Sequence, residues 1–288
     1  MIRTNKDKLI KQSLQGKIHH PMGGKHRVSY NGEPMVLPAT GGITYNVHAG
    51  DSAFDWEADH VEPSVSMRNE NENENSALLN LSCVGNIAKV ITGDAKGSLG
   101  YLLGGHGGPD HTIIEFSDDI MEKMVIGDSI IVKSYGQGLK LLDYPAIKML
   151  GIDPNLFENI DIKEENGILS FPVVCEVPSV LMGSGIGGPN PSVGDYDIMT
   201  QDLELIKELG IDKLKFGDFV LLRDCDNSFG RGHLTGAVTI GIVIHSDCIK
   251  AGHGPGIATF MTCKTSMIVP RIDAKANITN YIKRKLKF

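Results

Sequence analysis

The 288-residue sequence lacks several patterns that would assign it to a familiar class. No apolar run approaches the roughly 18 residues that a helix needs to cross a bilayer, so we expect no membrane protein. The first 17 residues are polar and rich in lysine, without the apolar core of a secretion signal. The five cysteines form no CxxC pair, which excludes a zinc ribbon and a redox dithiol. Their odd number and wide spacing favour a reducing cytoplasm.

Motifs for nucleotide binding and for covalent catalysis are also missing. No GxGxxG turn follows an expected strand and opens a helix with an acid downstream, and no P-loop signature occurs. Ser184 lies in Gly-Ser-Gly without the GxSxG spacing of a nucleophile elbow. Cys225 lies between two aspartates that disfavour its thiolate, so we do not expect it to be a nucleophile.

Charge is distributed unevenly along the chain. The formal net charge is −7, with +4 in residues 1–20 and +5 in residues 271–288, which leaves −16 for the 250 residues between them. An acidic body with basic ends offers no basic stripe on a folded surface, so we expect no nucleic-acid partner. The basic ends are expected to be solvated or packed on a subunit, with an interaction arm as the alternative.

Short apolar runs bounded by Gly, Pro, Asn and Asp recur along the chain, as in β-rich proteins. Seven runs predict strands: Leu78–Val84, Ile113–Phe116, Ser129–Lys133, Leu169–Val174, Asp218–Leu222, Ala237–His245 and Thr265–Val269. Three segments predict helices: Lys6–Gln15, Leu142–Gly151 and Thr200–Gly210. Val238–Ile244 is apolar at nearly every position, so both faces of that strand should be covered. We predict an α+β, predominantly β fold with a barrel- or sandwich-like core and a few peripheral helices.

The sequence indicates three parts without sharp boundaries between them. The polar stretch Asn69–Asn75 is expected to be a solvated loop tip. It ends an N-terminal Gly/Pro-rich segment, residues 1–75, which should pack on the core. A first β-rich part follows at 76–160 and a second at 161–288, and the two can form one continuous domain. Since a β-rich chain must cover its sheet edges, we expect a homo-oligomer.

Histidines flanked by glycine indicate a functional site. His106 lies in Gly-Gly-His-Gly-Gly and His253 in Gly-His-Gly-Pro-Gly. Glycine on both sides lets the backbone approach a ligand or metal closely, and a loop that only turns does not need an imidazole at its centre. The alternative is a turn histidine that bonds to the backbone.

A second candidate region is the acidic segment from His48 to Pro63. If residues 59–62 are extended, His60 and Glu62 point to one face, a spacing that suits two ligands of one metal. His111, five residues after His106, could join them around a divalent ion, and such His/carboxylate sets admit Zn, Mn or Fe. The alternative is an acidic surface loop.

Two loops are expected to bind a small-molecule substrate. The Gly/Pro-rich stretch 182–197 is longer than a connection needs, which favours a binding loop over a turn whose aspartates cap backbone amides. In the loop after the strand at 218–222, an arginine can clamp a carboxylate. The residues expected to contact the substrate are Ser184, Gly185, Asp195, Arg231 and His253.

Four segments together resemble an uncharacterised bacterial family known only as a domain of unknown function. The resemblance spans nearly the whole chain, and that family implies no activity. The segments are Pro38–Ile43, Asp59–Pro63, Gly104–Gly108 and Met182–Asp197.

The order of features is also distantly similar to the acetamidase/formamidase family of metal-associated amide hydrolases with a β-rich fold. Asp59-His60 precedes a proline, Gly127-Asp128 opens a strand, and Gly194–Asp197 is similar to that family's Gly-Gly-Asn-x-Asp stretch. The family's acidic Gly-Asp-Gly-Glu motif is missing, and Gly230–His233 stands roughly in its place. This departure leaves the position of a catalytic acid open.

These observations lead to the hypothesis of a cytoplasmic, metal-dependent hydrolase that acts on a small amide or a related C–N bond. The ion would lower the pKa of bound water, and a carboxylate would take the proton. The predicted metal ligands are His60, His106 and His111. The predicted proton acceptors are Glu62, Asp110 and Asp224. The alternative is a non-catalytic protein whose glycine-rich loops close over a carboxylate or phosphate.

Overall fold

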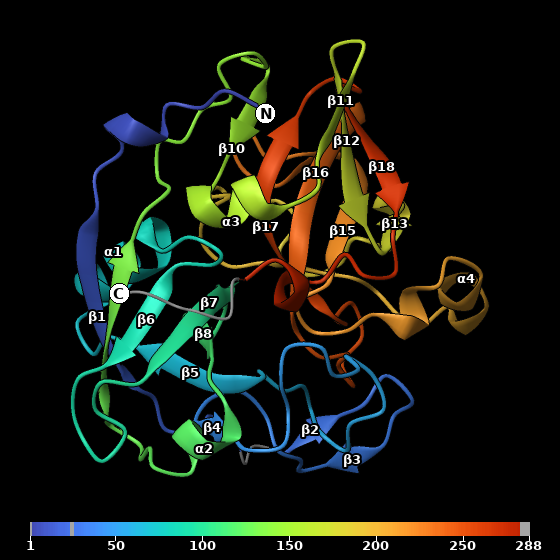
Figure 1. Cartoon of the computed structure of the whole chain (residues 1–288). Coiled ribbons are helices and arrows are strands. Elements are labelled where there is room, and N and C mark those ends of the chain that lie inside the picture. Colours follow the sequence, from blue (N-terminus) through green and yellow to red (C-terminus); the bar gives the residue numbers. More distant parts are fainter. Residues whose placement is uncertain (1, 24–25, 283–288) are drawn as a thin grey trace.

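The computed structural model describes residues 2–23 and 26–282 and consists mainly of β-strands (Figure 1). One large sheet comes from the N-terminal half of the chain and a second comes largely from the C-terminal half. This confirms the predicted α+β, predominantly β fold. The helices of the described part are short: α1 (Glu72–Leu81), α2 (Asp118–Met121), α3 (Pro154–Asn159) and α4 (Leu203–Glu208). No helix among the described residues has both the length and the apolar character required to span a membrane.

The first sheet closes on itself as a six-stranded antiparallel barrel, as the barrel-like prediction expected. Each strand pairs with the next, β5 returns to β1, and β4 (Ile43–Thr44) extends the sheet beyond β5. Closure leaves no free edge in these six strands. Their order around the barrel is β1 (Gln12–Ile18), β9 (Ser129–Ser134), β6 (Ile87–Val90), β7 (Leu99–His106), β8 (His111–Glu115) and β5 (Ser64–Arg68).

The second sheet is buried on both faces. Its central strand β16 alternates between two apolar clusters, with Ile242 in one and Val243 in the other. The neighbouring β15 alternates in the same way through Leu221 and Val220. This confirms that the apolar run 238–244 is covered on both sides. The strand order is β10 (Ile147–Met149), β17 (Gly256–Cys263), β16 (Gly232–His245), β15 (Phe219–Asp226) and β13 (Cys175–Val177), and β14 (Tyr196–Asp197) also pairs with β17.

Two smaller sheets complete the described strands. Their members are β11 (Lys163–Glu165), β12 (Ile168–Val173) and β18 (Ile268–Ile272) in one, and β2 (Arg27–Val28) and β3 (Pro34–Met35) in the other.

The barrel packs directly against the second sheet through β7 and β8. Leu102 and Ile114 belong to the apolar core inside the barrel, whereas the adjacent Leu103 and Ile113 belong to the core shared with the second sheet. This is the alternation that a strand with two covered faces requires. At Gly104 the two layers nearly touch, because an added Cβ would lie 2.7 Å from the Cβ of Ala258 on β17.

The predicted helix Lys6–Gln15 is wrong. The structure has a single 3₁₀ turn at Lys6–Lys8 and then strand β1, in which Leu14, Gly16 and Ile18 are buried on alternate positions. The apolar spacing there has a period of two, and pairing with β9 decides between helix and strand.

The predicted strand Leu78–Val84 and the predicted loop Asn69–Asn75 are both wrong, because helix α1 occupies most of the two. The side chain of Asn71 caps this helix by accepting hydrogen bonds from the amides of Asn73 and Glu74 at 3.0 and 3.1 Å. Asn75 is buried rather than solvated. The polar run is therefore a helix start.

The predicted helix Leu142–Gly151 is also wrong, whereas Thr200–Gly210 does contain helix α4. In the first segment Pro145 lacks the N–H that a helix interior needs, and β10 pairs with the edge of β17 instead. In the second segment Asp202, not Thr200, caps the helix, and Gly210 follows its end with a positive φ of 71°. The predicted strand Thr265–Val269 begins later, at Ile268.

Packing at Gly104 gives a first prediction. Gly104→Ala should lower the free energy of unfolding by about 1–3 kcal/mol, since the new methyl group has no room between the layers. Because the Ala258 methyl is the nearest obstacle, Gly104→Ala combined with Ala258→Gly should cost at least about 0.5 kcal/mol less than the two single changes together. Urea unfolding of the four proteins measures this coupling. Additive costs would show that the layers separate freely here.

An ion pair outside the apolar cores gives a second prediction. His48, in the loop before β5, has its Nδ1 2.9 Å from Glu115 Oε1 and its Nε2 2.7 Å from Asp118 Oδ1. Its hydrogen bond to Glu115 raises the pKa of His48 to about 9. The pair therefore stabilises the fold fully below about pH 6.5, the ordinary pKa, and the stabilisation is lost as the pH rises through about 9.

The stability difference between the protein and His48→Gln should accordingly shrink from neutral pH to pH 10. Solvent screens the partly exposed ring, so the full effect should be about 1 kcal/mol. Thermal unfolding of both proteins from pH 6 to 10 tests it. A difference that stays constant across this range would contradict the assigned protonation of His48.

Candidate metal centre

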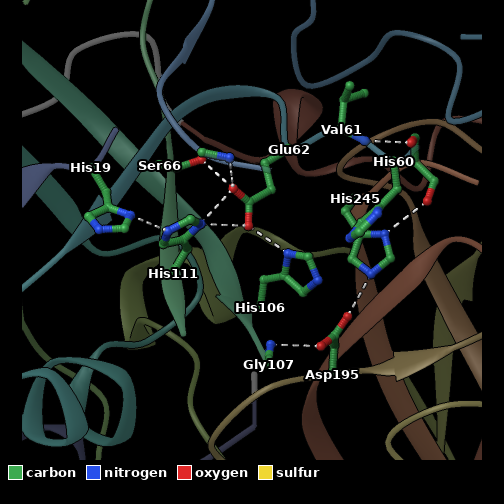
Figure 2. Close-up of polar contacts among 12 residues, drawn as sticks. His19, His60, Val61, Glu62, Ser66, His106, Gly107, His111, Asp195 and His245 are labelled. Carbon is green, nitrogen blue, oxygen red and sulfur yellow. Dashed lines mark hydrogen bonds and ion pairs between the residues drawn. The ribbon is translucent and has the colours of Figure 1, made fainter. Parts of the chain in front are cut away.

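Three histidines meet where the barrel joins the second sheet (Figure 2). His106 ends β7, His245 ends β16, and His60 lies in the loop before β5. The ring centroids of His106 and His245 are 4.3 Å apart, and that of His60 lies 5.3 and 5.2 Å from them. Imidazoles from three separate segments thus lie close together. The ligand atoms of His106 and His245 group with Asp195, and those of His60 group with Asp59 and Cys248.

Each of these rings has its Nδ1 held by an acceptor. An N–H at Nδ1 leaves the lone pair of Nε2 free, which is the arrangement of histidines that ligate a metal through Nε2. The acceptors are Asp59 Oδ1 for His60 at 3.0 Å, Glu62 Oε1 for His106 at 2.5 Å, and the carbonyl oxygen of Ser246 for His245 at 2.8 Å.

Asp195 adds a carboxylate to the cluster. One ligand atom each from Asp195, His106 and His245 can be chosen so that all three lie within 4.8 Å of one another. Asp195 Oδ1 accepts a hydrogen bond from the amide of Gly107 at 2.9 Å. Its Oδ2 is buried, has no hydrogen-bond partner and lies 2.9 Å from His245 Nε2. The carboxylate oxygen and the imidazole nitrogen thus face each other in a buried place, and a cation between these atoms would interact with both.

The backbone at Gly256 keeps this space open. Gly256 begins β17 and pairs with His245 on β16. A Cβ at this position would lie 2.1 Å from His245 Nε2 and 2.3 Å from Asp195 Oδ2. Only glycine fits there, so the main chain itself forms one wall of the site.

The pKa shifts of His60 and His245 favour the binding of a cation by the cluster. Burial lowers the pKa of His60 to about 4, helped by the neighbouring imidazoles and opposed by Asp59, so this ring is neutral at pH 7. Burial also disfavours charge on His245, but its contacts with Asp195 and Asp197 outweigh burial and raise the pKa of His245 well above its ordinary value. A metal ion would take the place of the proton that these two carboxylates hold on His245.

Glu62 fixes the orientation of the His106 ring through its contact with Nδ1. The Glu62 carboxylate is almost fully buried, and its two oxygens also lie 3.1 and 2.8 Å from His111 Nδ1. His111 Nε2 in turn lies 2.9 Å from His19 Nδ1. Because both of its ring nitrogens are engaged, His111 supports Glu62 and stands outside the cluster, on the opposite side of Glu62 from His245 (Figure 2).

A cavity of about 660 Å³ opens beside the three imidazoles. His60, His106 and Asp195 form part of its wall. His253 lines it as well and places its Nδ1 2.6 Å from Asp197 Oδ2. The remaining sequence-predicted residues in the wall are Asp110, Ser184, Gly185 and Arg231.

Three of the predicted site residues do not line the cavity. Glu62 and His111 lie behind His106, where they orient it. Asp224, on β15, accepts a hydrogen bond from the amide of Gly236 at 2.7 Å within the β15–β16 hairpin. Asp224 is therefore a turn residue, and the structure gives it no place in the candidate site.

Sequence reasoning missed His245, which takes the place proposed for His111. In the sequence, His245 is the last residue of an apolar strand, and no glycine flanks it. The signal that was present is its position: a histidine ends the most apolar strand of the chain, directly before Ser246-Asp247. Asp195 and Asp197 both lie within 3.1 Å of His245 Nε2.

A closed barrel packed on a second sheet, with a buried His/carboxylate cluster and a cavity at their junction, defines a β-rich protein with a candidate metal centre. Residues 26–158 match the family described as domain of unknown function (DUF4438), N-terminal, and residues 159–282 match its C-terminal counterpart. The chain belongs to this family. Neither match concerns the acetamidase/formamidase family, whose resemblance stays a prediction.

The chain is also similar to a solved protein, the crystal structure of TM1086. The two are 46% identical, the similarity covers 97% of this chain and 99% of that one, and the TM-score is 0.93. No match was found among proteins with curated descriptions.

The geometry of the cluster predicts which histidines a metal needs. His245→Ala should abolish stoichiometric binding of a divalent ion, because it removes a ligand. His111→Ala should keep binding but weaken it about 10- to 100-fold, the usual effect of losing outer support. Metal analysis of the purified proteins, followed by zinc titration, distinguishes the two. His20→Ala changes an exposed histidine outside the cavity wall and is the control. Full metal content in His245→Ala would remove His245 from the ligand set.

Proposed function

We propose that this protein is a metal-dependent hydrolase that acts on a small amide or a related C–N bond. Its divalent ion, Zn, Mn or Fe, would be held by the four residues His60, His106, His245 and Asp195. The observation that supports this is the close grouping of ligand atoms from His106, Asp195 and His245. The Nδ1 contacts of His60 and His106 leave the Nε2 of each of these two rings available to an ion. When bound, such an ion lowers the pKa of water towards neutrality and polarises a carbonyl group.

We propose that His253 moves the proton. Asp197 holds its Nδ1, which leaves Nε2 for exchange with a water molecule or with the leaving nitrogen of the substrate. The other oxygen of Asp197 lies 3.1 Å from His245 Nε2, so the same carboxylate connects His253 to the metal centre. Asp110 is the second candidate, since it alone of the three carboxylates predicted to accept the proton lines the cavity.

The amide class rests on the order of features similar to the acetamidase/formamidase family. The cavity volume suits a small molecule rather than a polymer. Ser184 and Gly185 line the wall contributed by the glycine-rich loop and are proposed to contact the substrate.

Kinetics of the metal-loaded protein test this proposal. Release of ammonia from a panel of small primary amides should be detectable, and His253→Ala should lower kcat about 100- to 10,000-fold without loss of metal, since it removes only proton transfer. Asp224→Asn, at the turn outside the cavity, is the matched control and should keep full activity.

Two outcomes would contradict the proposal. Turnover unchanged in both His253→Ala and Asp110→Ala would exclude the two proposed proton acceptors. A purified protein without metal that gains thermal stability from acetate or phosphate would instead favour the non-catalytic binding protein, because a ligand that binds only the folded state raises its stability.

A further inference from the structure

Arg231 is a buried cation in the cavity wall that lacks an acidic partner. It precedes β16, and the residue is only 7% exposed. Within the described part of the chain, every other arginine forms an ion pair with a carboxylate, and Arg231 forms none. The paired residues are Arg3 with Asp143, Arg27 with Asp59, Arg68 with Glu72, Arg223 with Glu176 and Arg271 with Asp161.

The guanidinium group is fixed by one hydrogen bond, but its other N–H donors lack an acceptor in the described part of the structure. Nη2 donates a hydrogen bond to the carbonyl oxygen of Val193. Nε is buried and has no partner, and no hydrogen bond of Nη1 is found among the described residues. The group also lies over the Tyr196 ring, with Cζ 5.5 Å from the centroid. A Cβ at Gly188 would lie 2.6 Å from Nη1, so this glycine makes room for the group.

This arrangement is costly without an anion. Burial lowers the pKa of Arg231, and the nearby Asp195 only partly opposes the effect. A buried guanidinium is normally compensated by a carboxylate that accepts its hydrogen bonds. Since the described chain supplies no such partner, a ligand in the cavity is the remaining source.

The position of Arg231 also fits the metal centre. Gly194, next to the proposed ligand Asp195, would bring a Cβ within 3.4 Å of Nη2. Lys250 lines the same cavity and adds a second positive charge. A small molecule bound to Arg231 through one end would therefore have its other end close to the imidazole cluster.

We propose that the substrate carries a carboxylate that binds Arg231, so that the protein acts on small amides that are also carboxylic acids. The amide part of this statement rests on the proposed function, whereas the binding of the carboxylate does not.

Isothermal titration tests the carboxylate directly. The probes are acetate, succinate and N-acetylglycine, each compared with its own amide, in which CONH₂ replaces COO⁻ at the same size. At least one carboxylate should bind at least 10-fold more tightly than its amide. Arg231→Met should remove this preference while the metal content stays unchanged. Arg223→Met, which removes a half-exposed paired arginine on β15, is the control and should keep the preference.

A second variant guards against misfolding. Gly188→Ala keeps the charge but places a methyl group against Nη1, so it should also weaken carboxylate binding. If no probe is preferred over its amide, or if Arg231→Met keeps the preference, the inference is overturned. Inorganic phosphate that binds more tightly than every carboxylate would also overturn it. A different result is that Arg231→Met loses the preference although the unmodified protein never holds metal. Arg231 would then remain an anion site, and the hydrolase proposal would be removed.

Discussion

The candidate site depends on the contacts that the buried carboxylate of Glu62 makes. Buried at the junction of barrel and sheet, it stays charged because His106 and His111 contact it and because the Gly41 amide and the Ser66 hydroxyl donate hydrogen bonds to it. Burial alone would raise the pKa of Glu62, yet these histidines hold it well below its usual range. The same bonds fix the ring of His106 against the metal centre. One buried anion therefore sets the orientation of a proposed ligand.

The rest of the site follows from how the two sheets approach each other. The barrel supplies His106 from the end of β7, and the second sheet supplies His245 from the end of β16 and Asp195 from the residue directly before β14. Gly104 and Gly256 permit this approach, because any side chain at either position would overlap the opposite layer or the site itself. Glycine at these two positions sets the distance between the residues of the candidate site rather than the flexibility of loops.

Much of this organisation is predictable from sequence, and what is not has a physical reason. The apolar strands around 169–174 and 237–245 are found because burial dictates their composition. His106 and His253 stand out because glycine surrounds them. His245 was missed because its role comes from its partners across the sheet, which no local pattern contains. The Asn/Glu run was misread because polarity is common to helix caps and loops, and only Asn75, buried against the Asp110 carbonyl, distinguishes them.

The pairing of β1 with β5, which closes the barrel, lies next to the residues that contact Glu62. We call this pairing the seam. Strand β1 meets β9 over six residue pairs but meets β5 over only two. Just past this short seam, the amide of His19 donates to the carbonyl of Ser66, and the side chains of these two residues contact His111 and Glu62, respectively. Opening of the barrel at its weakest joint would thus release the groups that hold Glu62. Amide hydrogen exchange along β1 would then report on the same fluctuation that loosens the candidate metal centre, and the pairing of β1 with β5 becomes a condition for an ordered site.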